Sequence, residues 1–270
     1  MLKKELLVAL FVLAILCTGC NDNQGSRETL ANAKIAQEET DGTKNSVERI
    51  AQSAVIVSPK KIENLHVVTK DEIVRIVATS SIDQQTEIII YKGTDELAYA
   101  AYKTADGNYL RFFEGGSYEN GYEVAPFEDV LGHRGFVLIA PLGAAFEAHN
   151  YYFFDSNNTL YLLIQCTNYV VESDLNHDGS KDLIWFYHGN PDDQVGAREA
   201  FYAYSDGGSV YEVSINNLVK EKFGVRNELF YYDSSNEDLT VLFQSSEKEN
   251  GNSRFLITLT SDEVIFSPLE

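Results

Sequence analysis

Short apolar runs separated by turn residues restrict the fold of this chain more than any other feature. From about Ala54 onward, stretches rich in Val, Ile, Tyr and Phe alternate with Gly, Asp and Asn, which is typical of antiparallel strands joined by hairpins. Helical patterns of ten residues or more are few and Asn216–Phe223 is the best candidate for a short helix, so we expect an all-β fold, mostly of antiparallel sheets. Strands are expected at Ile73–Ala78, Glu87–Lys92, Tyr99–Lys103, Tyr109–Phe113, Phe136–Ala140, Tyr151–Asp155, Leu160–Cys166, Leu183–Tyr187, Ala200–Tyr204, Val210–Ser214, Leu229–Tyr232, Thr240–Gln244, Phe255–Leu259 and Val264–Phe266.

One hairpin pattern recurs at spacings of about 50 residues. In each copy an aromatic-rich or apolar strand leads to an Asp-containing turn and then to a second apolar strand. The copies are AAYKTADGNYLRFF around Asp106, NYYFFDSNNTLYLL around Asp155, FYAYSDGGSVYEV around Asp206 and, more loosely, FLITLTSDEVIF around Asp262. A unit of roughly four strands and this length matches the blade of a β-propeller. A β-sandwich or an open stack of sheets explains the same pattern, and the chain has room for only four or five such units.

The first twenty residues have the parts of an export signal. Lys3 and Lys4 precede an apolar run of about eleven residues that is too short to span a bilayer, and small polar residues then lead to Cys20. This arrangement resembles the signal peptide of bacterial lipoproteins, in which the Cys after the cleavage site is diacylated. The resemblance implies that residues 1–19 are removed, that Cys20 carries lipid such as palmitate, and that the protein is anchored to a bacterial membrane in the cell envelope, on its extracytoplasmic side.

The region after the lipidated Cys differs in composition from the rest of the chain. Residues 21–53 are polar and contain no aromatic residue, so we expect 20–53 to form the lipid anchor and a flexible tether, and 54–270 to form the β domain. The tether is either a spacer that lifts the domain off the membrane or a terminal tail without function. After cleavage, Cys166 is the only other Cys, and its apolar surroundings predict a buried thiol and no disulfide.

Residues 174–182, DLNHDGSKD, place oxygen-bearing side chains at alternating positions, as a calcium-binding loop does. Gly179 permits the sharp turn that wraps such a loop around one ion. An EF-hand needs a bidentate Glu at the twelfth position, where this chain has Trp185, and the following LIWFY is a strand pattern. We therefore predict a structural Ca²⁺ site in a loop that enters a strand, the alternative being a polar turn without an ion. The predicted ligands are Asp174, Asn176, Asp178 and Asp182 through side-chain oxygens, and Ser180 through its backbone carbonyl.

The stretch SDLNHDGSKDLIWFYHG, followed by AFYAYSDGGSVYEV, resembles an FG-GAP or VCBS repeat, the blade type of integrin-like β-propellers. The resemblance covers about 40 residues and implies a propeller-like domain that binds Ca²⁺ and acts as a binding or interaction module. The preceding unit, FEDVLGHRGFVLIAP, retains only Asp129 at the equivalent place. The later unit around KFGVRNELFYY retains none, so a single ion is expected.

The charge balance excludes some partners. The chain has 21 Lys and Arg against 41 Asp and Glu, a formal net charge of -20, which argues against a nucleic-acid surface. It contains no zincin, nucleophile-elbow, P-loop or Rossmann motif, and its five His lack zinc-ligand spacing. We therefore expect a non-enzymatic module with a protein or glycan ligand. An accessory or sensor module of an envelope signalling system and an envelope glycan hydrolase are the alternatives, the latter because acidic pairs are numerous.

Overall fold

The computed structural model describes residues 47–51, 53–83, 86–118, 120–143, 146–192, 196–225, 227–244, 252–260 and 262–269. Contacts divide the chain into residues 1–33 and 34–270, and every element below belongs to the second unit. The expected signal peptide, Cys20 and the tether as far as residue 46 lie outside the described residues. Among the described residues, no helix has the length and apolar character needed to cross a membrane.

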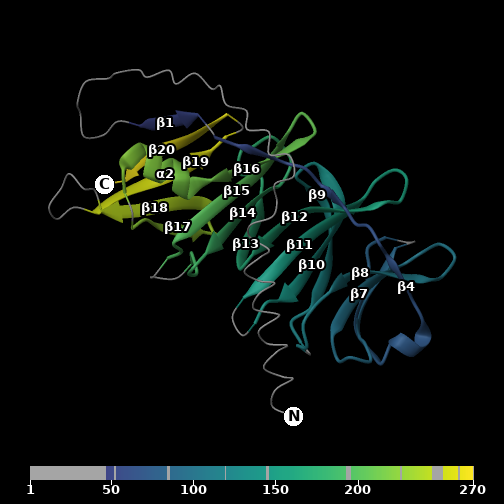
Figure 1. Cartoon of the computed structure of the whole chain (residues 1–270). Coiled ribbons are helices and arrows are strands. Elements are labelled where there is room, and N and C mark those ends of the chain that lie inside the picture. Colours follow the sequence, from purple (N-terminus) through teal and green to yellow (C-terminus); the bar gives the residue numbers. More distant parts are fainter. Residues whose placement is uncertain are drawn as a thin grey trace, which may run out of the picture. The chain divides into compact units, whose positions relative to one another are not determined.

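The expected all-β fold is confirmed: the described part of the chain forms four antiparallel sheets of five strands each (Figure 1). Sheet 1 contains β5 (Arg75–Ser81), β6 (Glu87–Lys92), β7 (Ala98–Lys103), β8 (Tyr109–Glu114) and β4 (His66–Val68). Sheet 2 contains β9 (Glu123–Val130), β10 (His133–Pro141), β11 (Glu147–Phe154), β12 (Leu160–Thr167) and β3 (Lys60–Lys61). Sheet 3 contains β13 (Tyr169–Ser173), β14 (Asp182–Tyr187), β15 (Glu199–Asp206), β16 (Ser209–Ser214) and β2 (Val55–Val57). Sheet 4 contains β17 (Leu229–Asp233), β18 (Asp238–Gln244), β19 (Asn252–Leu259), β20 (Glu263–Leu269) and β1 (Glu48–Ala51).

Each sheet is built on a meander of four consecutive strands, which explains the repeat seen in the sequence. The four recurring hairpins are β7–β8, β11–β12, β15–β16 and β19–β20, the third and fourth strands of successive meanders. The strands alternate between two faces, so each meander can bury one face against the sheet before it and the other against the sheet after it.

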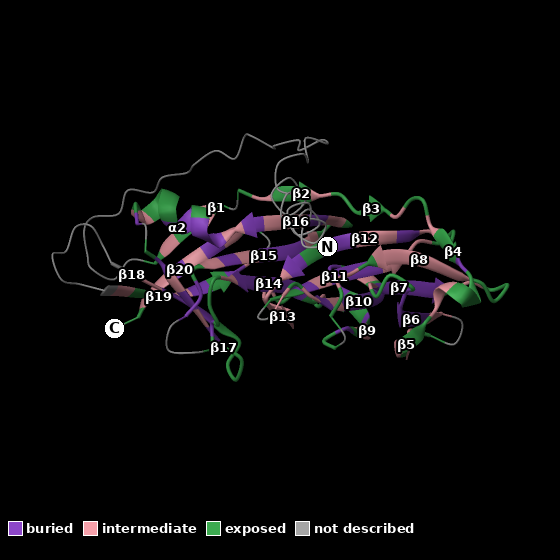
Figure 2. Cartoon of the chain, turned by 60° about the horizontal axis from the view of Figure 1, so that its bottom comes forward, coloured by how far each residue is buried: buried purple, intermediate pink, exposed green. Residues whose placement is uncertain are grey.

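Three hydrophobic clusters join the sheets in chain order, and Figure 2 shows buried residues along the strands of all four sheets. Ile90 of sheet 1 shares a cluster with Phe136 of sheet 2, and Tyr151 of sheet 2 shares one with Trp185 of sheet 3. The third cluster brings sheet 3 residues together with Phe230 and other side chains of sheet 4. The arrangement is an open stack of sheets, one of the architectures expected from the sequence.

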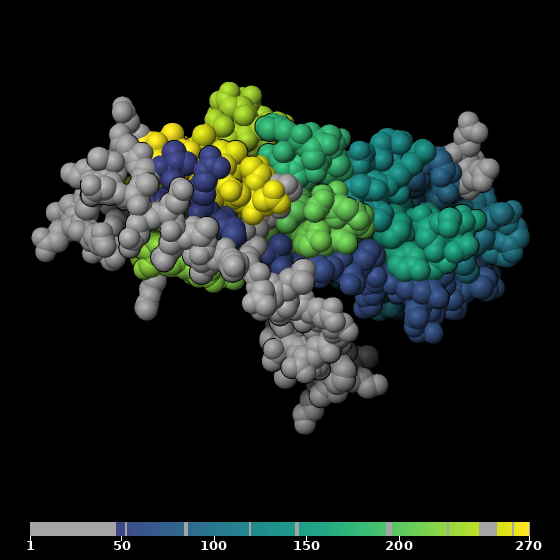
Figure 3. Space-filling model, turned by 90° about the horizontal axis from the view of Figure 1, so that it is seen from above, coloured from purple at the N-terminus to yellow at the C-terminus, as the bar shows by residue number. Residues whose placement is uncertain are grey.

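The fifth strand of every sheet comes from a single segment, Glu48–Val68, which we call the strap. Its strands pair antiparallel with the last strand of each meander in reverse order: β1 with β20, β2 with β16, β3 with β12 and β4 with β8. Figure 3 shows its purple and blue atoms beside yellow, green and teal sheets in turn. The strap also places apolar side chains against every cluster in the stack, namely Ile50, Val57, Ile62, Leu65 and Val68.

The first strand of the strap, β1, lies in residues that the sequence assigned to a tether. Glu48–Ala51 is paired with β20, so the β domain begins before Ala54. The expected helix is confirmed as α2 (Ile215–Phe223), which begins where the Ser214 side chain accepts a hydrogen bond from the Asn217 backbone N–H. It ends at Gly224, whose left-handed φ of 65° is the usual helix stop. One turn of 3₁₀ helix, η1 (Lys70–Glu72), follows the strap. Cys166 is a fully buried free thiol, as expected.

Candidate functional site

The predicted calcium loop lies between β13 and β14, the first and second strands of sheet 3. Its backbone turns sharply, with left-handed φ values of 60° at His177 and 95° at Gly179. A Cβ added to Gly179 would meet nothing within 4 Å, so the glycine is needed for its backbone angle rather than for space. His177 is exposed, as expected for a residue that faces away from an ion.

Hydrogen bonds hold the loop's polar side chains over its own backbone. Asp174 accepts at one oxygen from the Asp178 N–H (2.9 Å) and at the other from the Gly179 N–H (3.0 Å). Asn176 Oδ1 also accepts from the Asp178 N–H, and Asp178 Oδ1 accepts from the Ser180 N–H. Four of the five predicted ligand residues, all but Asp182, are thus gathered in one turn by these contacts.

Asp182 opens β14 and lies beneath the loop, with an exposed fraction of only 1%. Its Oδ2 accepts hydrogen bonds from the Leu175 and Asn176 N–H groups and from the Tyr202 hydroxyl (3.0 Å). Its Oδ1 is buried and has no hydrogen-bond partner among the described residues. Burial raises the pKa of this carboxyl to about 7, although those hydrogen bonds oppose the shift. Among the described residues no cationic side chain pairs with this carboxylate, and a cation in the loop above would supply the missing positive charge.

Ser180 has a role that the sequence did not suggest, because its hydroxyl connects two sheets. It donates to Asp129 Oδ1 (2.9 Å) at the end of β9 and accepts from the Gly132 N–H (3.0 Å) in the β9–β10 turn. Two backbone hydrogen bonds between Lys181 and this turn complete the contact. The loop of sheet 3 is therefore attached to the corresponding turn of sheet 2.

The corresponding turn of sheet 4 is residues 234–237, which directly follow LFYYD. The sequence pattern placed the equivalent position around KFGVRNELFYY, where it indicated no ligand residue. The turn itself follows that stretch, and it and its flanks contain Asp233, Glu237 and Asp238. Glu237 accepts a hydrogen bond from the Ser173 hydroxyl at the end of β13 (2.7 Å). The turns between first and second strands of sheets 2, 3 and 4 are thus linked in a row.

The donor set suits Ca²⁺, since it combines three carboxylates, one amide oxygen and one backbone carbonyl, all hard oxygen ligands. The described residues nevertheless contain no three His, Cys, Asp or Glu side chains that already stand close enough to hold a metal ion. The side-chain oxygens of Asp174, Asn176 and Asp178 instead accept hydrogen bonds from N–H groups of the loop itself. The residues are brought together, but the coordination geometry is not formed.

No protein-family model, curated protein or solved structure matches this chain. The loop, its buried Asp182 and the strapped stack of sheets are therefore interpreted on their own chemistry. Tyr202 and Glu237 are the site residues that sequence reasoning missed. Tyr202 lies in β15, twenty positions after Asp182, and no pattern in the sequence connects the two.

Proposed function

We propose that the protein is an envelope lipoprotein, anchored through Cys20, whose β domain binds one structural Ca²⁺ and acts as a binding module. The observation that supports calcium binding is Asp182, a buried carboxyl with an orphaned oxygen beneath a loop of further oxygen ligands. The proposed ligands are Asp174, Asn176, Asp178 and Asp182, with Ser180 through its carbonyl. The four strand meanders are the proposed counterparts of FG-GAP-like blades in an open, propeller-like array.

The ion's proposed role is to hold sheets 2 and 3 together. The loop that would carry Ca²⁺ is the same loop that contacts Asp129 and Gly132. In the absence of a cation, Asp174, Asp178 and Asp182 repel one another within one short turn. Binding would remove this repulsion and tighten the loop against sheet 2. At 10 mM Ca²⁺, a dissociation constant of roughly 10⁻⁴–10⁻³ M stabilises a protein by about 1.4–2.7 kcal/mol.

Calorimetric titration of the detergent-solubilised full chain, with a thermal melt, tests calcium binding. We expect one site and a rise in melting temperature of about 3–10 °C at 10 mM Ca²⁺. Asp178→Asn, which keeps an oxygen for the Ser180 N–H but removes the charge, should abolish both effects. Asp155→Asn is the matched control, since Asp155 accepts two backbone hydrogen bonds in another turn. If 10 mM Ca²⁺ gives no heat of binding and no change in the melting temperature of the unsubstituted chain, the loop is only a polar turn.

Membrane fractionation tests the anchor separately. Cys20→Ala should release the protein from the membrane pellet and prevent incorporation of labelled palmitate. Cys17→Ala, three residues earlier, is the control and should remain lipidated. A Cys20→Ala variant that still incorporates palmitate would disprove the assignment of the lipid to Cys20.

A further inference from the structure

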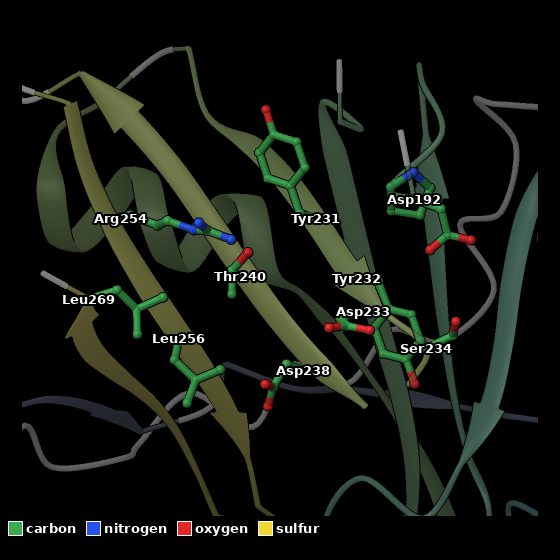
Figure 4. Close-up of a pocket in the computed structure, with 11 residues that line it drawn as sticks. Asp192, Tyr231, Tyr232, Asp233, Ser234, Asp238, Thr240, Arg254, Leu256 and Leu269 are labelled. Atoms are coloured by element: carbon green, nitrogen blue, oxygen red, sulfur yellow. The ribbon is translucent and has the colours of Figure 1, made fainter. Parts of the chain in front are cut away.

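A hollow of about 740 Å³ lies on the face of sheet 4 that points away from sheet 3 (Figure 4). This volume is within the range of small-ligand sites. Its floor is formed by β17, β18 and β19, and Pro191 and Asp192 from the β14–β15 loop close one side. The Pro191 carbonyl accepts from the Tyr232 N–H (3.2 Å), which attaches that loop to the free edge of β17.

Strand register fixes which side chains share the floor. Tyr231 on β17 is opposite Thr240 on β18, and Thr240 is opposite Leu256 on β19. The residues on either side, such as Phe230 and Val241, belong to the core shared with sheet 3. The middle of the hollow is therefore a row of an aromatic ring, a hydroxyl and an aliphatic side chain. Thr240 is 6% exposed, and its hydroxyl has no hydrogen-bond partner in the described structure.

Opposite charges stand at the two ends of this row. Asp233 and Asp238 face each other across β17 and β18 at one end. Arg254 is at the other end, opposite Leu242, four residues along β18 from Asp238. At roughly 3.3 Å per strand residue, the backbone positions of Asp238 and Leu242, the partner of Arg254, are about 13 Å apart along β18. In Figure 4 the Arg254 guanidinium lies on one side of Thr240, while the two carboxylates lie on the other.

The Asp238 and Arg254 side chains are exposed. Neither Asp238 nor Arg254 has an ion pair or a side-chain hydrogen bond among the described residues. Hydrogen bonds from Ser235 and Asn236 in the adjacent turn lower the pKa of Asp233 and keep it ionised. Burial, followed by the charges of acidic residues that include Asp233 and Asp238, raises the pKa of Tyr232 to about 12.

We propose that the hollow binds a short peptide with both termini free, its amino group at Asp233 and Asp238 and its carboxylate at Arg254. Three to four extended residues span about 10–14 Å, which is similar to the backbone separation of the two ends along β18. Tyr231 and Leu256 would contact the peptide side chains between the termini. The proposal rests on the binding-module role and gives it a ligand class, but it does not depend on calcium.

The test uses the tripeptide Ala-Leu-Ala and calorimetry on the detergent-solubilised full chain. Acetylating the peptide's amino group or amidating its carboxylate should each weaken binding on the order of tenfold, since each removes a charge-assisted contact. Arg254→Gln should weaken binding of the free peptide as much as amidation does. Amidating the peptide should then cause no further loss in this variant. Asp238→Asn should likewise weaken binding of the free peptide, and acetylating the peptide should cause no further loss in this variant. Arg134→Gln, at an exposed arginine of sheet 2, is the control and should change nothing.

Three outcomes would overturn the proposal: no binding of the free peptide, no effect of blocking either terminus, or unchanged binding by both variants. A polyamine that competes fully while Arg254→Gln has no effect would also overturn it, because only the acidic end would then be used. The calcium and peptide proposals are tested separately by titrating Arg254→Gln and Asp238→Asn with calcium, which both variants should still bind. An Asp178→Asn variant that loses calcium binding but still binds the peptide would show that the peptide site is independent of the calcium site.

Discussion

The strap offers a direct test of what holds it on sheet 1, because β4 contains two adjacent valines in opposite environments. Val68 is 8% exposed and packs in a cluster with Ile89 and Tyr91 on the outer face of sheet 1, whereas Val67 is 53% exposed. Both substitutions to Ala remove the same atoms and the same strand preference. Their difference therefore measures side-chain burial alone.

The expected magnitude follows from the buried groups removed. Val68→Ala deletes two buried methyl-sized groups at about 0.8 kcal/mol each, and the small cavity adds to this, so the loss is about 2 kcal/mol. Val67→Ala should stay within about 0.5 kcal/mol of the unsubstituted protein. With a urea dependence near 2 kcal/mol per molar, the midpoint of Val68→Ala should fall by about 1 M.

Urea unfolding followed by tryptophan fluorescence and circular dichroism measures both variants side by side. Coincident transitions from the two probes would show that the sheets unfold together. Equal midpoints for Val67→Ala and Val68→Ala would refute the reasoning, because the strap would then not be held on sheet 1 by the burial of Val68.

Three further predictions concern other parts of the stack. Burial lowers the pKa of His149 on β11, so the unfolded chain takes up a proton near pH 6.5 before the folded one does. Stability should therefore fall as the pH drops below about 6.5, and His149→Gln should reduce that loss in urea midpoints at pH 7.5 and 5.5. Gly135→Ala should be strongly destabilising, by about 2–4 kcal/mol, because a Cβ there would stand 1.9 Å from the Tyr152 carbonyl oxygen; a near-normal melting temperature would contradict this. Asn216→Ala should cost about 2–3 kcal/mol, since the buried amide bonds two backbone groups and Glu228, and a melt of this variant beside Asn217→Ala checks it.

Local patterns predicted most of the strands, and the reasons for the misses are physical. The recurring hairpins are formed by neighbouring segments, so their apolar alternation is enough to indicate them. The strap strands contain only two to four residues each, and their partners lie far away in the sequence. β9 contains Pro126, which argues against a strand, but β9 is at the edge of sheet 2 where proline is tolerated.

The candidate site was predictable in composition but not in arrangement. Alternating oxygen side chains identified the loop, and the structure gathers Asp174, Asn176 and Asp178 in one turn above Asp182. That Asp182 is almost fully buried depends on the packing of sheet 3 against its neighbours. The contact of Ser180 with Asp129 joins residues 51 positions apart, and it depends on how two sheets stack.

The reversed order of the strap has a consequence for how the chain folds during synthesis. The strap leaves the ribosome before any of its partner strands, and each later meander supplies one new edge for it. β4 can pair once β8 has emerged, then β3 with β12 and β2 with β16, whereas β1 must wait for β20, the last strand of the fourth meander. Arg49 and Glu263, which form an ion pair across that last contact, are 214 positions apart. Closing such a distant pair is slow, so the strap's first strand should be the last of the four to join its sheet.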